Sequence, residues 1–167
     1  RNAKDFMNLV KVYLDAVFQP SIYDSPNTFY QEGWHYELKE GEERPTYKGV
    51  VFNEMKGAFA SVETQVEMGM NRLLFPQSCY RFVSGGDPEK ITDLSYAQFL
   101  DAHREYYHPS NARIYLDGDV DLDAVLALLD EEYLCHYEQL EKTHDIAHQP
   151  LVEARQLTAP YAIGAQE

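Results

Sequence analysis

The sequence predicts a folded domain in which helices and short strands alternate. Apolar residues recur at helical spacing in several segments, and short strand-like runs lie between them, bounded by turns rich in Gly and Pro. At 167 residues, a chain can bury about 70% of its unfolded surface. The 44% content of hydrophobic residues is also ordinary for a globular protein. A hydrophobic core is therefore expected.

The first expected helix covers residues 6–18, and Pro20 ends it. Asn2 or Asp5 has the right side chain to cap its start. The apolar residues of this segment fall three or four apart: Phe6, Leu9, Val10, Tyr13, Leu14, Val17 and Phe18. This pattern is typical of an amphipathic helix that packs on one face.

An aromatic stretch with partial alternation predicts a strand at residues 34–38, and the charged residues 39–45 should form an exposed loop. A second helix is expected over residues 47–74, closed by Pro76. Its glycines weaken the pattern, and a break near Gly57 is compatible with it. The apolar residues that define this helix are Met55, Phe59, Val62, Val66, Met70 and Leu73.

The second half of the sequence continues the alternation. Residues 84–88 read as a tight turn, and a helix is expected from Ser95 to about Tyr107. Residues 112–117 predict a short strand, and a fourth helix is expected around residues 122–129. The polar, irregular residues 143–160 look like an interdomain linker, and residues 161–165 would begin a strand of a following domain.

Charge and cysteine content exclude several classes of protein. The formal net charge is −14, so an anionic partner such as nucleic acid is disfavoured. The two cysteines, Cys79 and Cys135, lie in no metal-ligand pattern, which argues against a disulfide scaffold or a zinc knuckle. No apolar run reaches the ~20 residues of a membrane span. A first residue other than Met suggests that the chain begins inside a larger protein.

No complete catalytic motif is present, because the sequence lacks GxSxG, P-loop, HExxH and inverted HxxEH patterns. His144 and His148 have the spacing of two helical ligands but lie in the polar linker. Gly85 and Gly86 could cradle an anion or simply form a turn. Glu54 stands out as a carboxylate in an apolar stretch. In this stretch it is expected to be partly buried, and a partly buried carboxylate must be hydrogen-bonded, paired or metal-bound. Both a structural and a functional role stay open.

Five segments, in order along the chain, resemble presequence proteases of the pitrilysin/insulinase superfamily of zinc metallopeptidases. They are residues 5–18 (DFMNLVKVYLDAVF), 31–37 (QEGWHYE), 47–57 (YKGVVFNEMKG), 84–88 (SGGDP) and 107–113 (YHPSNAR). An ordered series of this kind is far more specific than one short motif.

The resemblance implies a zinc ion (Zn²⁺) held by two histidines of an inverted HxxEH motif, whose glutamate is the general base, and by a third glutamate downstream. It maps that metal ligand onto Glu54, and it places the HxxEH motif and the base upstream of Arg1. A His₂Glu ligand set leaves one position open for water, as a catalytic zinc requires. The chain alone would then lack two ligands and the base, and should be inactive by itself.

The same resemblance implies an α+β fold, with helices on one face of a mostly antiparallel sheet in a partial processing-peptidase-like domain. Residues 1–142 would be the C-terminal part of the first catalytic domain, and residues 143–167 the linker and the start of the next. The implied function is cleavage of short or unstructured peptides, in a bacterial cytoplasm or an organelle matrix. The alternative is a non-catalytic scaffold or assembly subunit. The expected partners are peptide substrates, the remaining domains of the protein, and further copies of the isolated chain.

Overall fold

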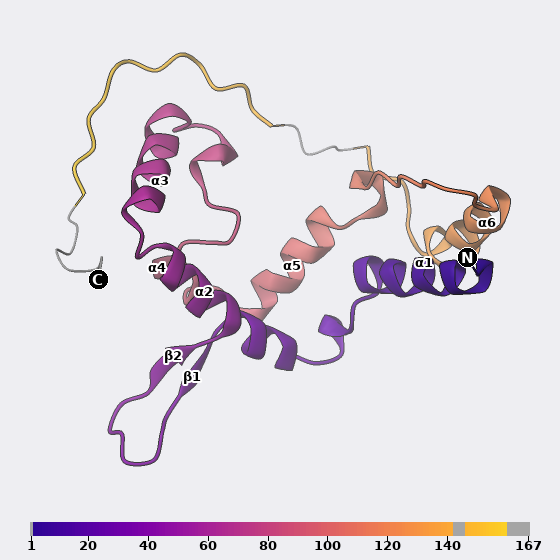
Figure 1. Ribbon diagram of the computed structural model, residues 1–167, viewed down its shortest axis with the longest axis horizontal. Helices are drawn as coiled ribbons and strands as arrows, with labels where there is room; N and C mark the ends of the chain where they lie inside the picture. The colour runs from indigo at the N-terminus through magenta and orange to yellow at the C-terminus, as the bar shows by residue number, and fades with distance from the viewer. Residues whose placement is uncertain (1, 142–145, 160–167) are drawn as a thin grey trace. The chain divides into compact units, whose positions relative to one another are not determined.

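The computed structural model describes residues 2–141 and 146–159, which fall into two compact units (Figure 1). The first unit is made by Arg1–Pro26 together with Tyr96–His144, and the second by Asn27–Ser95 together with Asp145–Glu167. In the described ranges, no helix is both long and apolar enough to cross a bilayer.

The first unit is helical. Its helices are α1 (Ala3–Phe18), α5 (Tyr96–Tyr106) and α6 (Leu122–Glu132), joined by 3-10 turns η1 (Ser21–Tyr23), η4 (Pro109–Asn111) and η5 (Leu134–His136). Asn2 caps α1 by accepting a hydrogen bond from the Lys4 amide at 3.0 Å. The core of this unit consists of Phe18, Val125, Leu129 and Tyr133, each at most 5% exposed.

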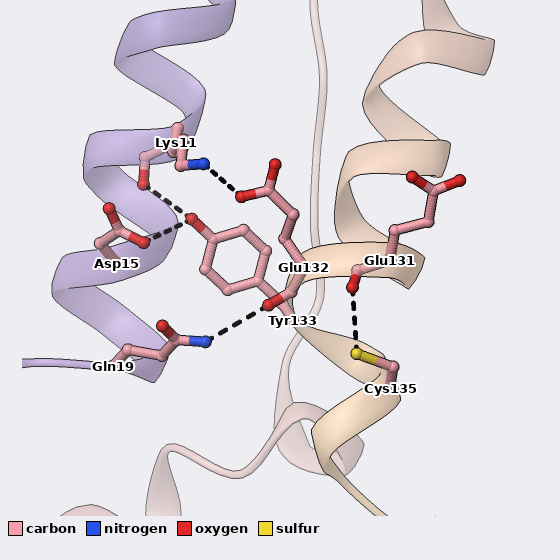
Figure 2. A network of polar contacts seen from close by, with 7 residues as sticks. All are labelled: Lys11, Asp15, Gln19, Glu131, Glu132, Tyr133 and Cys135. Atoms are coloured by element: carbon pink, nitrogen blue, oxygen red, sulfur yellow. Dashed lines mark hydrogen bonds and ion pairs between the residues drawn. The ribbon is translucent and has the colours of Figure 1, made fainter.

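Polar contacts around Tyr133 join α1 to the end of α6 (Figure 2). The Tyr133 hydroxyl donates to Asp15 Oδ1 at 2.5 Å and lies 3.2 Å from the Lys11 carbonyl. The Gln19 amide donates to the Glu132 carbonyl at 3.3 Å, and Lys11 forms an ion pair with Glu132. Burial, followed by the hydrogen bond to Asp15, raises the pKa of Tyr133. Tyr133 is therefore a neutral hydrogen-bond donor at physiological pH.

The second unit contains a hairpin followed by helices. Its elements are the π-helical turn η2 (Phe29–Gly33), β1 (His35–Glu37), β2 (Thr46–Lys48), α2 (Val50–Ala58), α3 (Val62–Leu74), η3 (Cys79–Arg81) and α4 (Pro88–Ile91). The strands are antiparallel, and Tyr36 lies opposite Tyr47. The buried apolar side chains are Phe29, Phe52, Met68 and Ile91.

The structure confirms most of the expected helices. The first, third and fourth are α1, α5 and α6, and Asn2 rather than Asp5 is the cap. The expected break near Gly57 is also found, because residues 59–61 separate α2 from α3. Ser61 starts α3 by accepting from the Thr64 amide, so the second part has its own N-cap.

Two expectations about strands were wrong. Residues 46–48 form β2 rather than the start of a helix, because Gly49 at φ 150° ends the strand before α2 begins. Residues 112–117 form no strand within the described structure, where the one sheet pairs β1 with β2. The strand at 34–38 is confirmed as β1, and residues 146–159 are irregular as expected. The strand expected at 161–165 lies outside the described residues.

Candidate metal centre

The start of α2 is fixed by a contact between two glycines. A Cβ on Gly49 would lie 2.1 Å from the Gly33 carbonyl oxygen and 2.7 Å from Trp34 Cα. The φ of Gly49 is also one that residues with a side chain rarely adopt. The backbone at residues 33–34 therefore touches the backbone from which α2 begins, and this contact requires glycine at position 49.

Aromatic side chains surround the same point. The ring of Trp34 lies 5.5 Å from that of Tyr36 and 5.8 Å from that of Tyr47, and the Tyr47 ring lies 6.0 Å from buried Phe52 on α2. Such edge-to-face pairs contribute about 0.5–1.5 kcal/mol each beyond their burial. The Trp34 indole donates to the Leu94 carbonyl at 2.8 Å. The hydrogen bond to Tyr36 raises the pKa of Tyr47. The hairpin is thereby attached to α2.

A second glycine contact fixes the middle of α2. A Cβ on Gly85 would lie 2.3 Å from the sulfur of Met55. The Met55 side chain therefore occupies the space beside Gly85, in the turn that precedes α4. Phe52 and Met55 are three residues apart and share the inner face of the helix. The sequence segments 31–37, 47–57 and 84–88 thus meet around one short helix.

Glu54 lies on the opposite, outward side of α2. Its side chain is exposed, as are Asn53 and Gly57, and a Cβ on Gly57 would meet nothing within 4 Å. No hydrogen bond or ion pair joins the Glu54 carboxylate to any other described residue. The expectation of a partly buried carboxylate was wrong, because the apolar neighbours Phe52 and Met55 point inward while Glu54 points outward. The Glu54 carboxylate is therefore accessible on the outer side of α2.

Within the described ranges, no cluster of three or more His, Cys, Asp or Glu residues could hold a metal ion. Glu54 is therefore at most one ligand of a site, and a carboxylate oxygen is a donor that zinc accepts. Its position fits this role, since the carboxylate is exposed and has no competing partner among these residues. The general base expected upstream of Arg1 is not part of the sequence.

Two histidines of the first unit, His103 and His108, make contacts unrelated to a metal site. His103 Nε2 donates to the Val17 carbonyl at 2.9 Å, so Nδ1 accepts from the Tyr23 hydroxyl at 2.7 Å in the neutral ring. His108 Nδ1 accepts from the Ser110 amide at 3.1 Å. His144, one of the pair with ligand spacing, lies outside the described residues.

Comparison with known proteins identifies the family. Residues 93–163 match the family model described as the Peptidase M16 inactive domain. The chain is 50% identical over 137 residues, 82% of its length, to presequence protease 1, chloroplastic/mitochondrial, of Arabidopsis thaliana, and covers 13% of that protein. It is 41% identical over 153 residues, 90% of its length, to the mitochondrial presequence protease of Mus musculus, and covers 15% of it.

A further relative is protein HypA of Clostridium perfringens, which is 43% identical over 168 residues. That alignment covers 100% of this chain and 17% of the relative. The chain thus spans less than a fifth of the length of these relatives. The resemblance carried by segments 5–18 to 107–113 is confirmed. The chain belongs to the presequence protease branch of the M16, or pitrilysin/insulinase, superfamily.

Proposed function

We propose that the protein containing this chain is a zinc metalloendopeptidase that degrades short or unstructured peptides, and that Glu54 supplies the third zinc ligand. The observation that carries the proposal is the exposed Glu54 carboxylate, which has no partner among the described residues and stands on a helix fixed at Gly49 and Met55. The relatives named presequence proteases support the peptidase assignment.

A bound zinc ion supplies Lewis acidity and lowers the pKa of its water toward ~7. The part of Glu54 is to hold the metal as an anionic oxygen donor. The proton acceptor would be the glutamate of an HxxEH motif, which the chain does not contain. The contacts of Gly49 with Gly33 and of Met55 with Gly85 would hold α2, and with it Glu54, in place. This matters because small displacements of a ligand are costly in metal sites.

We further propose that the chain is part of an α+β domain in which helices cover one face of a mostly antiparallel sheet. The helices and the two-stranded sheet of the described residues are compatible with such a partial domain. Residues 1–142 would end the first catalytic domain and residues 143–167 would lead to the next. As the resemblance implies, this domain and the remaining ones would enclose a chamber that admits unfolded peptides. Relatives named mitochondrial, and one from a bacterium, support an organelle matrix or a bacterial cytoplasm.

A non-catalytic scaffold subunit is the alternative function. It is favoured by the match of residues 93–163 to an inactive M16 domain. Reading the ~100 codons upstream of Arg1 separates the two, because a ligand set of two histidines and one glutamate needs the HxxEH motif. Its presence supports the peptidase, and its absence supports the scaffold.

The test of the zinc ligand is Glu54→Gln in the full-length protein. Gln is nearly isosteric but a poorer donor for zinc, and even changes next to metal ligands typically cost ~10–100-fold in affinity or activity. Zinc content and turnover of a quenched fluorogenic peptide should therefore fall together, while the melting temperature measured without metal should be unchanged. Glu67→Gln is the matched control, because Glu67 is an exposed carboxylate on α3 of the same unit.

Two results would contradict this role of Glu54. A Glu54→Gln protein with full zinc and normal turnover would show that Glu54 is not the ligand. A variant that fails to fold would show that this glutamate has a structural role. The 167-residue chain alone should not cleave the peptide with or without added zinc, because it lacks two ligands and the base.

A further inference from the structure

We propose that a basic pocket in the second unit binds a carboxylate group of a peptide. The proposal rests on the peptidase function proposed above and names a second point of substrate contact. The pocket has a volume of about 590 Å³ and lies between the end of α3, η3 and α4. Arg72, Arg81 and Lys90 line it, one from each of these elements.

The charge of this pocket is opposite to that of the chain. The sequence carries 28 acidic and only 14 basic residues, yet three basic side chains line the pocket and Asp87 is its single acidic one. The local excess of positive charge would attract an anion, and low-dielectric walls strengthen such a field. A polyanion would be repelled by the rest of the chain, so a single carboxylate is the better match.

The two guanidinium groups are held in place and keep donors to spare. Arg72 Nη2 lies 3.0 Å from Asp87 Oδ2. Arg81 Nη1 donates to the Pro76 carbonyl at 3.0 Å, and its guanidinium lies 4.7 Å above the Phe82 ring centroid. A guanidinium carries five N–H donors, and the hydrogen bonds to Asp87 and to Pro76 use one donor of each arginine. Arginine is also the side chain best suited to bidentate recognition of a carboxylate.

The acidic side chain of the pocket has a structural role. Asp87 caps α4 by accepting from the Glu89 amide at 3.0 Å, and its other oxygen faces Arg72. Gly86 before it has φ 94°, and a Cβ there would lie 3.0 Å from Ile91 Cγ1. The loop is therefore fixed in a conformation that favours glycine. Asp87 thus orients Arg72 without neutralising Arg81. Lys90 Nζ lies 3.5 Å from Asp93 Oδ2, in an ion pair whose two side chains are exposed and which contributes little.

The apolar walls of the pocket indicate which chemical group is attached to the carboxylate. Pro76 and Val83 line the pocket together with Phe82, whose side chain is 67% exposed. Apolar walls beside convergent cations suit a carboxylate attached to an apolar group. A free peptide C-terminus with an apolar last residue has this chemistry, and an acidic side chain next to an apolar residue is the other possible source.

The ligand-side test uses the full-length protein with a chelator present, so that zinc neither cleaves nor binds the probe. The probe is a fluorescent decapeptide ending in leucine, as the free acid and as the amide. The free acid should bind at least about tenfold more tightly, as expected for hydrogen bonds to a charged group. A third probe, an amide with an internal glutamate, identifies the source of the carboxylate. If it binds as tightly as the free-acid peptide, the pocket accepts the carboxylate of an acidic side chain. Equal affinity for all three probes would overturn the proposal.

The protein-side test compares Arg81→Gln and Lys90→Gln with the control Arg44→Gln. Arg44 is an exposed cation in the hairpin loop of the same unit and does not line the pocket. In the two pocket variants, the ratio of affinities for the free acid and the amide should fall toward one. In the control it should be unchanged. Lys90 is 75% exposed, so its variant should fold even if the Arg81 variant does not. An unchanged preference in the folded Lys90 and Arg81 variants would refute the assignment.

This outcome is distinguishable from failure of the proposed function, which is measured as zinc-dependent turnover. A protein that cleaves peptides without preferring the free acid would lack the carboxylate pocket and keep the peptidase function. A protein that prefers the free acid but cleaves no peptide would support the carboxylate pocket and contradict the proposed peptidase function.

Discussion

Tyr133→Phe should weaken the attachment of α1 to α6 without disturbing the core. The change removes only the hydroxyl, and the ring, whose centroid lies 6.4 Å from that of Phe18, is retained. The lost contacts are the 2.5 Å hydrogen bond to Asp15 and the 3.2 Å approach to the Lys11 carbonyl (Figure 2). No cavity is created, so the cost is that of the hydrogen bond alone.

A hydrogen bond to a charged group contributes about 1.5–3 kcal/mol. Asp15 is only half-buried, so water can replace part of the lost contact. The expected loss is therefore at the lower end, about 1.5 kcal/mol, or roughly tenfold in an equilibrium constant. It should be measured as the free energy of the opening that exposes the amides of α1 and α6 to hydrogen exchange.

The matched control is Tyr13→Phe, because Tyr13 lies on the same helix and is 69% exposed. The opening free energy should hardly change in Tyr13→Phe. A double-mutant cycle of Tyr133→Phe with Asp15→Asn should show that most of the free energy lost in Tyr133→Phe is coupling between Tyr133 and Asp15. The reasoning would be refuted if Tyr133→Phe and Tyr13→Phe changed the protection of α1 and α6 equally.

Three further predictions concern both units. The folded-state pKa of Tyr133 lies above its ordinary value, so its contribution to stability is complete below pH ~10 and is lost above it; the slope of opening free energy against pH should be smaller in Tyr133→Phe, and equal slopes would contradict this. Gly49→Ala should destabilise the second unit by more than about 1 kcal/mol, since its Cβ would lie 2.1 Å from the Gly33 carbonyl; thermal melts test this against Gly57→Ala, whose Cβ is unobstructed. The isolated chain should self-associate through exposed apolar side chains such as Tyr115, which is 87% exposed; a clean monomer in sedimentation at high concentration would count against it.

Helices with strong periodicity and the first strand of the hairpin were predictable from the sequence, but the second strand was not. The spacing of Phe6 to Phe18 requires only local information, and α1 appears where it was expected. The residues of β2, in contrast, continue smoothly into the apolar pattern of α2, and only the contact of Gly49 with Gly33 separates strand from helix. Gly49 is visible in the sequence, but the distant residue that it contacts cannot be inferred from local spacing. Residues 112–117 have strand-like composition but no partner strand in the described structure.

The candidate site was predicted from the resemblance rather than from local chemistry. Glu54 stays a predicted zinc ligand, but its expected partial burial was wrong, because helical geometry turns Glu54 away from Phe52 and Met55. The basic pocket could not be found in the sequence either. Arg72, Arg81 and Lys90 are nine residues apart, a spacing that matches neither helix nor strand, and only the fold brings them together.

The contact between Met55 and Gly85 has a consequence for oxidative damage. Oxidation to the sulfoxide adds a polar oxygen to the sulfur and converts a flexible apolar side chain into a polar one. There is no spare room between the sulfur and Gly85, because a Cβ on Gly85 would lie only 2.3 Å from the sulfur. An added oxygen directed there would have to displace the turn or rotate the Met55 side chain out of its place. Because Met55 follows Glu54 directly, peroxide would damage the candidate ligand's support without any reaction at the carboxylate itself.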